Sequence, residues 1–162
     1  MKYPSITAIA NSYRRSDGST TQGERNAYLL HDMRAVRWQP VSGDDIDLAL
    51  ARMCYYRFYD RDKKGIRALW QRTTEEAYLA VKHSPYWLIH RDEPLSGDLM
   101  FSRYKFAASE RVHVSIVDTP INNSELIWIY ETPPFYSPSS PNKTIVDRTR
   151  VLPERMRYRA FM

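Results

Sequence analysis

The sequence predicts an α+β domain, with about three helices packed on a largely antiparallel sheet and an extended C-terminal arm. Two observations lead to this class. Apolar residues recur at helical spacing in the first half of the chain, whereas the second half holds stretches rich in β-branched and aromatic residues, separated by clear turns. Helices that precede strands joined by short connections favour antiparallel pairing. The length of 162 residues suits one domain with one core.

The strongest helical pattern lies within residues 44–59. Its apolar residues follow the spacing i, i+3, i+4, i+7 and i+8, namely Ile46, Ala49, Leu50, Met53 and Cys54. Cys54 should therefore point into the core. Two further helices are predicted at residues 24–38 and 73–82, and Thr73 with Glu76 provides a capping box for the second.

The predicted strands fall into two groups. Short strands are expected at residues 5–10, 66–71 and 86–90. The main part of the sheet should come from residues 99–106, 111–117 and 125–131, which are rich in β-branched and aromatic side chains.

The composition changes after Thr132. Four prolines follow among serines, which predicts an extended segment because proline cannot continue a strand ladder: Pro133, Pro134, Pro138 and Pro141. Residues 143–162 hold six basic and two acidic side chains, so they contribute +4 of the net charge of +5. We therefore expect a single α+β domain at residues 1–132, followed by a Pro-rich segment and basic arm at residues 133–162.

Composition also argues against several kinds of site. A single cysteine provides neither a disulfide nor a CxxC zinc site, and five glycines include no phosphate-binding loop. We therefore expect no metal and no cofactor. No apolar run approaches the ~18 residues of a membrane span, and the first residues show no signal peptide, so the sequence predicts a cytoplasmic protein without membrane contact.

Two motifs are candidates for catalysis. His113 lies in a hydrophobic–His–hydrophobic–Ser strand, the pattern of two-histidine phosphoesterases, but that acid–base chemistry needs a second such strand and no other histidine lies in one. We interpret His113 as a half-exposed strand residue. Asp60, Asp62 and Lys64 match the D-x-K of metal-dependent nucleases, but no preceding strand supplies a second carboxylate, so we interpret them as a solvated turn.

Basic and aromatic residues suggest a binding surface. Arg103, Tyr104 and Lys105 combine cations with a ring, as single-strand nucleic-acid platforms do. The arm is the stronger candidate, since arginine binds phosphate and carboxylate through two parallel hydrogen bonds. Its arginines are Arg148, Arg150, Arg155, Arg157 and Arg159, and the polar loop near the N-terminus adds Arg14 and Arg15. The partner is either nucleic acid or an acidic protein surface, including that of a neighbouring subunit.

Short motifs within residues 6–43 carry a family resemblance. They are Ile6-Thr7-Ala8, Tyr13-Arg14-Arg15, Glu24-Arg25-Asn26-Ala27, Leu30, Asp32-Met33-Arg34-Ala35 and Pro40-Val41-Ser42-Gly43. This quarter of the chain resembles the opening strand–loop–helix of phage-encoded S-adenosylmethionine lyases. The resemblance implies an enzyme that degrades the methyl donor of host restriction systems, with sites between subunits. The glycine, tyrosine and acidic pattern expected next is missing, so no catalytic residue is carried over.

The sequence as a whole favours a small basic binding protein of phage or plasmid type over an enzyme. It would engage nucleic acid or a protein partner through the arginine-rich arm and the aromatic sheet, as a homo-oligomer or part of an assembly. Two alternatives stay open. One is an oligomeric phage-type S-adenosylmethionine lyase that counteracts host restriction, and the other is a structural subunit of a larger, virion-like assembly.

Overall fold

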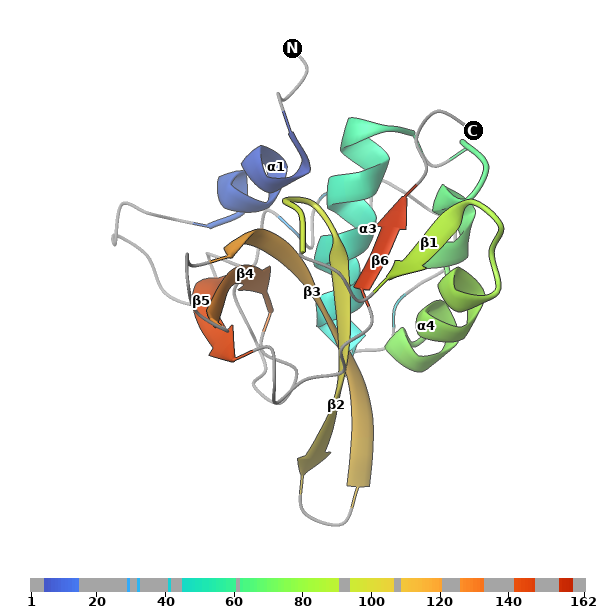
Figure 1. Cartoon of the computed structure of the whole chain (residues 1–162). Coiled ribbons are helices and arrows are strands. Elements are labelled where there is room, and N and C mark those ends of the chain that lie inside the picture. The colour runs from blue at the N-terminus through green and yellow to red at the C-terminus, as the bar shows by residue number, and fades with distance from the viewer. Residues whose placement is uncertain are drawn as a thin grey trace.

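The computed structural model describes residues 5–14, 29, 32, 41, 45–60, 62–90, 94–106, 109–120, 126–132, 142–147 and 155–158. These residues form helices and an antiparallel sheet, which confirms the predicted α+β class (Figure 1). The elements are α1 (Ile6–Ser12), α3 (Ile46–Phe58), η2 (Ile66–Leu69), α4 (Thr74–Lys82), β1 (Trp87–His90), β2 (Leu99–Phe106), β3 (Ser109–Pro120), β4 (Leu126–Glu131), β5 (Asn142–Asp147) and β6 (Arg155–Tyr158). None of the described helices is long and apolar enough to cross a bilayer.

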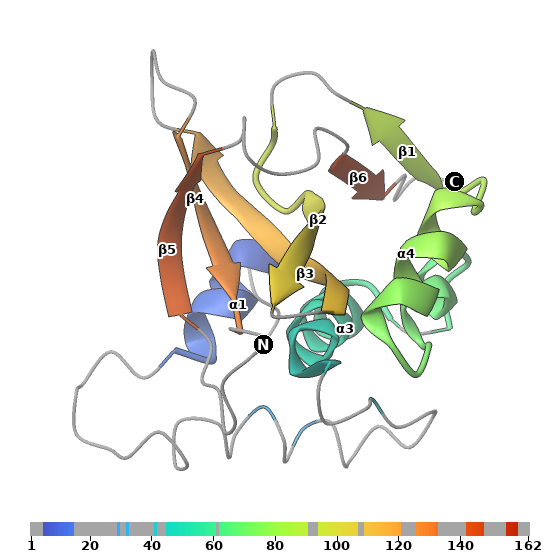
Figure 2. The same ribbon diagram turned by 90° about the horizontal axis from the view of Figure 1, so that it is seen from below.

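The sheet has the strand order β1-β6-β2-β3-β4-β5, and every neighbouring pair is antiparallel. The longest pairing joins β2 to β3, from Leu99 opposite Ile116 to Phe106 opposite Ser109. The register of β3 against β4 shifts between Val117 and Thr119. Figure 2 shows α1, α3 and α4 on the same face of the sheet. The main core therefore lies between this helical layer and the strands.

The two predicted helices that the structure describes in full form where their patterns place them. Within residues 44–59, α3 buries Ala49, Leu50, Met53 and Cys54, so the thiol does point into the core, as predicted. At the start of α4, the Thr73 hydroxyl accepts a hydrogen bond from the Glu76 backbone N–H at 3.1 Å. This contact is the cap that the sequence predicts. The helix expected at residues 24–38 lies outside the described residues, apart from Leu29 and Asp32.

The strand predicted at residues 5–10 is wrong, because Ile6–Ser12 is the helix α1. The Ser5 hydroxyl caps it by accepting from the Ala8 N–H at 3.0 Å. Ile6, Ile9 and Ala10 are buried on one side of the helix, at the spacing i, i+3, i+4. The sequence therefore contains both the helical spacing and the capping residue, but the stretch is too short for the spacing to distinguish a helix from a strand.

The strand predicted at residues 66–71 is also wrong, since Ile66–Leu69 is a 3-10 helix. It follows Gly65, whose φ of +92° lies in the left-handed region that glycine tolerates best. The Ala68 N–H donates to the Gly65 carbonyl at 3.2 Å. Ile66 and Leu69, three residues apart, lie on one side of this tighter helix and are both fully buried.

Three polar side chains in the core are bonded to backbone carbonyls. The Arg52 side chain is 3% exposed, its Nε donates to the Leu69 carbonyl at 2.7 Å, and its guanidinium also donates to the Gln71 carbonyl. Burial lowers the pKa of Arg52 to about 10, so the group stays charged at neutral pH. The Tyr55 hydroxyl donates to the Gly97 carbonyl, and the Trp87 Nε1 to that of Gly65. The bonds of Arg52 and Tyr55 fix α3 against η2 and the loop before β2, and the bond of Trp87 joins β1 to the start of η2.

Two stretches of the segment expected to form an extended arm are strands of this sheet. β5 pairs with β4 over six residues, from Leu126 opposite Asp147 to Glu131 opposite Asn142. β6 lies between β1 and β2, with Met156 opposite both Ile89 and Leu99. The other residues of 133–162 lie outside the described ranges. Both strands therefore pair within the described sheet.

Deleting residues 143–162 should destabilise the domain. The deletion removes β6 and all but one residue of β5, and in the described sheet β1 is joined to β2 only through β6. We expect urea unfolding followed by circular dichroism to show a lower midpoint and a broader transition than for the full chain. Deleting only residues 159–162, which leaves all of β6, is the matched control. Equal stability of the longer deletion would contradict this placement of β6.

Candidate nucleic-acid interface

The β2–β3 hairpin extends beyond the rest of the sheet. Figure 1 shows the paired strands projecting below the body of the molecule. The predicted binding residues Arg103, Tyr104 and Lys105 lie on β2 along this projection. Arg111 lies on β3 directly opposite Tyr104, and Lys105 is opposite Glu110. The pairing of β2 with β3 therefore places a third basic residue, Arg111, next to the three predicted binding residues.

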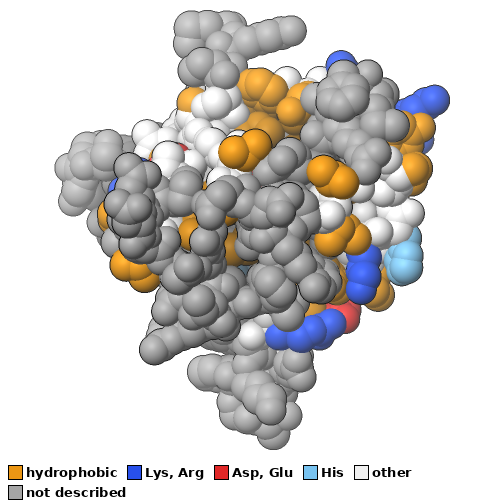
Figure 3. Space-filling view, in the orientation of Figure 1, with side chains coloured by type: hydrophobic (Ala, Val, Ile, Leu, Met, Phe, Trp, Pro, Cys, Tyr) orange, Lys and Arg blue, Asp and Glu red, His pale blue; other side chains and the backbone are white. Residues whose placement is uncertain are grey.

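Arg103 is oriented by α4 but stays accessible. Its guanidinium lies 3.6 Å from the Glu75 carboxylate and 5.9 Å from the centre of the Tyr78 ring. The Arg103 side chain is 41% exposed and that of Glu75 is 48% exposed, so this ion pair contributes little to stability. Tyr78 packs on Phe101 at 5.2 Å between ring centres. Figure 3 shows basic side chains beside an acidic one where α4 meets the base of the hairpin.

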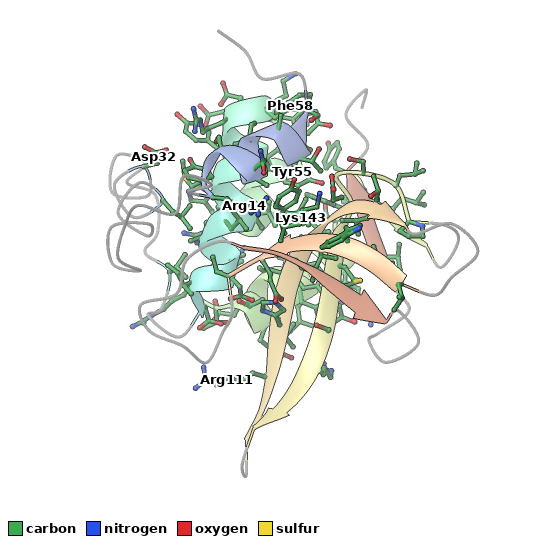
Figure 4. The ribbon with its side chains drawn as sticks, turned by 90° about the vertical axis from the view of Figure 1, so that its left-hand side faces the viewer. Arg14, Asp32, Tyr55, Phe58, Arg111 and Lys143 are labelled. Carbon is green, nitrogen blue, oxygen red and sulfur yellow. The ribbon has the colours of Figure 1, made fainter. Side chains whose placement is uncertain are left out.

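A second group of charged side chains and rings lies on β3, β4 and β5 and just after α1. We call it the β4–β5 cluster, and it consists of Arg14, Asp118, Trp128, Tyr130 and Lys143. The Lys143 Nζ lies 2.8 Å from the Asp118 carboxylate, 5.2 Å from the centre of the Trp128 ring and 5.7 Å from that of Tyr130. Arg14 comes close enough to hydrogen-bond the Tyr130 hydroxyl. Figure 4 shows Arg14 and Lys143 near each other above the hairpin.

The charges of this cluster follow from its contacts. The hydrogen bond to Asp118 raises the pKa of Lys143 above its usual value, and a smaller effect of burial opposes this shift. Lys143 is therefore a cation at neutral pH. Burial and the nearby Asp118 raise the pKa of Tyr130, although Lys143 and Arg14 oppose this. The phenol is therefore neutral. Two cations thus lie around one neutral phenol and one half-buried indole.

Arg14 is held in place through the end of α1. The neighbouring Tyr13 hydroxyl donates to the Asp32 carboxylate at 2.6 Å and accepts from the Arg57 guanidinium at 3.2 Å. Burial, followed by the bond to Asp32, raises the pKa of Tyr13 above its usual range. Arg14 itself bonds the Asn11 side chain at 3.0 Å. The helix end is therefore fixed, and Arg14 projects from a rigid support.

His113 is buried, so the prediction of a half-exposed residue is wrong. Its side chain is 1% exposed, and it lies between two carboxylates from different elements. Nδ1 is 3.0 Å from Asp47 on α3, and Nε2 is 2.8 Å from Glu131 on β4. The sequence missed this arrangement because both partners are distant along the chain.

The two carboxylates keep the buried imidazole charged. Burial alone would lower the pKa of His113, but the hydrogen bonds and charges of Asp47 and Glu131 outweigh it and raise the pKa to about 9. Asp47 also accepts from the Thr74 hydroxyl at 3.0 Å and from the Val114 N–H at 2.8 Å. With both ring nitrogens occupied by carboxylates, His113 acts as a structural cation.

The remaining predicted residues are placed only in part. Arg155 and Arg157 are positions on β6 within the sheet. Four others lie outside the described residues, namely Arg15, Arg148, Arg150 and Arg159. The sequence did not single out Trp128, although its alternation with Tyr130 along one strand was a usable signal. The role of Lys143 at this site depends on the β4–β5 register, which no local pattern predicts.

The D-x-K motif lies in a turn. The Asp62 N–H bonds the Asp60 side chain at 2.9 Å, and the Asp62 carboxylate lies 3.5 Å from Arg67 at an exposed position. Among the described residues, no group of three His, Cys, Asp or Glu side chains is arranged to hold a metal ion. Burial raises the pKa of the Cys54 thiol, which makes it a poor nucleophile.

Comparisons with known proteins found no match to this chain. No family model matches the sequence, no curated protein is significantly similar to it, and no solved structure is significantly similar to its fold. The function is therefore inferred from the residues of this chain.

The charged His113 should make stability depend on pH. In the unfolded chain histidine titrates near pH ~6.5, and in the folded protein at about 9. Below pH ~6.5 the raised pKa of His113 contributes its full free energy of stabilisation. Between this pH and about 9 the folded protein keeps a proton that the unfolded chain has released, so the free energy of unfolding falls as the pH rises. Above about pH 9 the contribution is lost. The slope is at most about 1.4 kcal/mol per pH unit, the value for one proton.

Urea unfolding across this pH range, with NMR of labelled histidine, measures the effect. The wild type and His83→Gln, which changes an exposed histidine, should show the same decline, and His113→Gln should lack the part due to His113. Cys54 is present in all three chains, so its titration cancels in the comparison. A His113 resonance that titrates near pH ~6.5 would contradict the assignment.

Proposed function

We propose that the protein binds nucleic acid through the β2–β3 hairpin and the basic residues around it. The observation that supports this most is the position of Arg103, Lys105 and Arg111 on a two-stranded ribbon that projects from the body. Such a ribbon is narrow enough to enter the major groove of a duplex, ~12 Å wide, or to lie along a single strand. Tyr104 lies directly opposite Arg111, so these two positions share one face of the ribbon. Arg103 and Lys105 share the other face.

The contacts of Arg103 would allow it to exchange the Glu75 carboxylate for a phosphate of the nucleic acid. Its carboxylate partner Glu75 is about half exposed, so the pair is weak in water. A phosphate offers the guanidinium two parallel hydrogen bonds and a stronger charge. Binding would therefore replace a weak contact by a stronger one without unfolding any element. The buried packing of Tyr78 against Phe101 keeps the platform under Arg103 unchanged during that exchange.

The charge of the chain favours the same class of partner. The net charge of +5 attracts polyanions and raises their association rate. Six of the basic residues lie in residues 143–162, and two of these, Arg155 and Arg157, are on β6 next to β2. Arg155 lies opposite Met100, so these arginine positions are at the end of β2 within the body of the molecule, away from its projecting part. An acidic protein surface is the competing partner, and binding measurements with DNA separate the two.

Alanine substitution on the hairpin should weaken nucleic-acid binding uniformly across sequences. Fluorescence anisotropy with labelled DNA, as duplex and as single strand, measures Kd over a series of salt concentrations. The salt slope should fall by about 0.9 for duplex, or about 0.7 for single strand, for every phosphate that a variant no longer neutralises. The variants are Arg103→Ala, Lys105→Ala and Arg111→Ala.

Lys63→Ala is the matched control. Lys63 is an exposed cation in the turn that follows α3. Figure 1 shows this end of α3 on the far side of the body from the projecting β2 and β3. Its removal changes the net charge equally and should leave the salt slope unchanged. Absence of binding by the wild type at low salt would overturn the proposal and leave an acidic protein as the partner to seek. If the control and the hairpin variants lower the salt slope equally, binding depends on the net charge of the protein and not on the hairpin.

A further inference from the structure

The β4–β5 cluster combines an accessible ring with charges that the hairpin proposal does not use. Trp128 and Tyr130 are two residues apart on β4, so they share a face of the strand. Tyr130 is 5% exposed and packs with the main core, whereas Trp128 is half-buried. The tyrosine therefore fixes the strand, and the indole keeps part of its surface open.

From this geometry we infer that the β4–β5 cluster is a stacking site for an unpaired nucleobase, so that the preferred ligand is single-stranded nucleic acid. The inference rests on the proposed function and names its substrate class. A base in a duplex is already stacked on both faces, and taking it out costs a few kcal/mol. An unpaired base has a free face, which any aromatic ring set in a sheet can cover.

The cations lie where the backbone beside a stacked base would need them. The Lys143 Nζ lies over one face of the Trp128 ring, 5.2 Å from its centre, so a base would stack on the other face of the indole, and Arg14 is next to Tyr130. Phosphates that flank a base on Trp128 would thus meet a lysine and an arginine from two different elements. Asp118 holds Lys143 at 2.8 Å and neutralises one charge, which leaves the cluster with a net positive charge and a defined lysine position.

The cluster lies at one edge of the described sheet. β5 is the last strand of the described sheet and pairs with β4 alone. Lys143 lies opposite Tyr130 in this pairing, near the start of β5. In Figure 4 the labelled Arg14 and Lys143 lie above the hairpin, from which Arg111 projects. A single strand bound at the cluster can therefore continue towards the hairpin cations.

The test compares labelled oligothymidine with a duplex of equal length by anisotropy. We expect wild-type protein to bind the single strand more tightly. Trp128→Leu should weaken single-strand binding by about 5- to 150-fold, the range for removal of one stacked base, and leave duplex binding unchanged. Trp128→Phe, which keeps a ring, should retain most of the affinity. Lys143→Gln should lower the single-strand salt slope by about 0.7.

The outcomes separate this inference from the proposed function. If both nucleic acids bind equally and Trp128→Leu has no effect, the stacking site is wrong while the hairpin proposal stands. If the wild type binds neither, the proposed function fails first. Thermal unfolding identifies a Trp128→Leu protein that is not folded, and in that case Lys143→Gln decides: an unchanged single-strand salt slope in this variant overturns the inference.

Discussion

The carboxylate of Asp47 holds four elements of the described structure together. It lies in the first turn of α3 and is 1% exposed. One oxygen accepts from Thr74 at the start of α4, and the other accepts from the Val114 N–H of β3 and faces His113. Through His113 the connection continues to Glu131 at the end of β4. Two helices and two strands thus depend on one buried acid, which would be costly to bury without these donors.

This arrangement explains where the sheet is rigid and where it projects. β4 ends at Glu131, and Asp47 then supplies the acceptor that the Val114 N–H would otherwise lack. Beyond this point, β3 continues with β2 alone towards the hairpin. The base of the hairpin is therefore clamped by charged hydrogen bonds, while its far part has no neighbouring strand in the described sheet. A firmly held base gives an exposed ribbon a defined direction without a core of its own.

How much the sequence could predict depends on how far apart the contacting residues are. Local period and capping were sufficient for α3, α4, β2, β3 and β4. They gave a wrong prediction for residues 5–10, because the pattern of six residues does not distinguish a short apolar strand from a short capped helix. They also failed for His113, because Asp47 lies 67 residues before Val114 and no spacing rule connects them. Lys143 meets Trp128 only through the β4–β5 register, and the preceding prolines gave no reason to expect that strand.

The C-terminal segment shows why charge in a sequence does not by itself describe a surface. Residues 143–162 carry most of the net charge, yet two of their stretches are strands, and β6 is an interior strand bonded on both sides. Arg155 and Arg157 therefore occupy positions whose backbone holds β1 to β2. Removing the segment would change stability and charge together, so a truncated chain that fails to bind would not identify the residues that touch the ligand. Point substitutions that keep the backbone, read through the salt dependence of binding, separate the two because each neutralised phosphate has its own increment of slope.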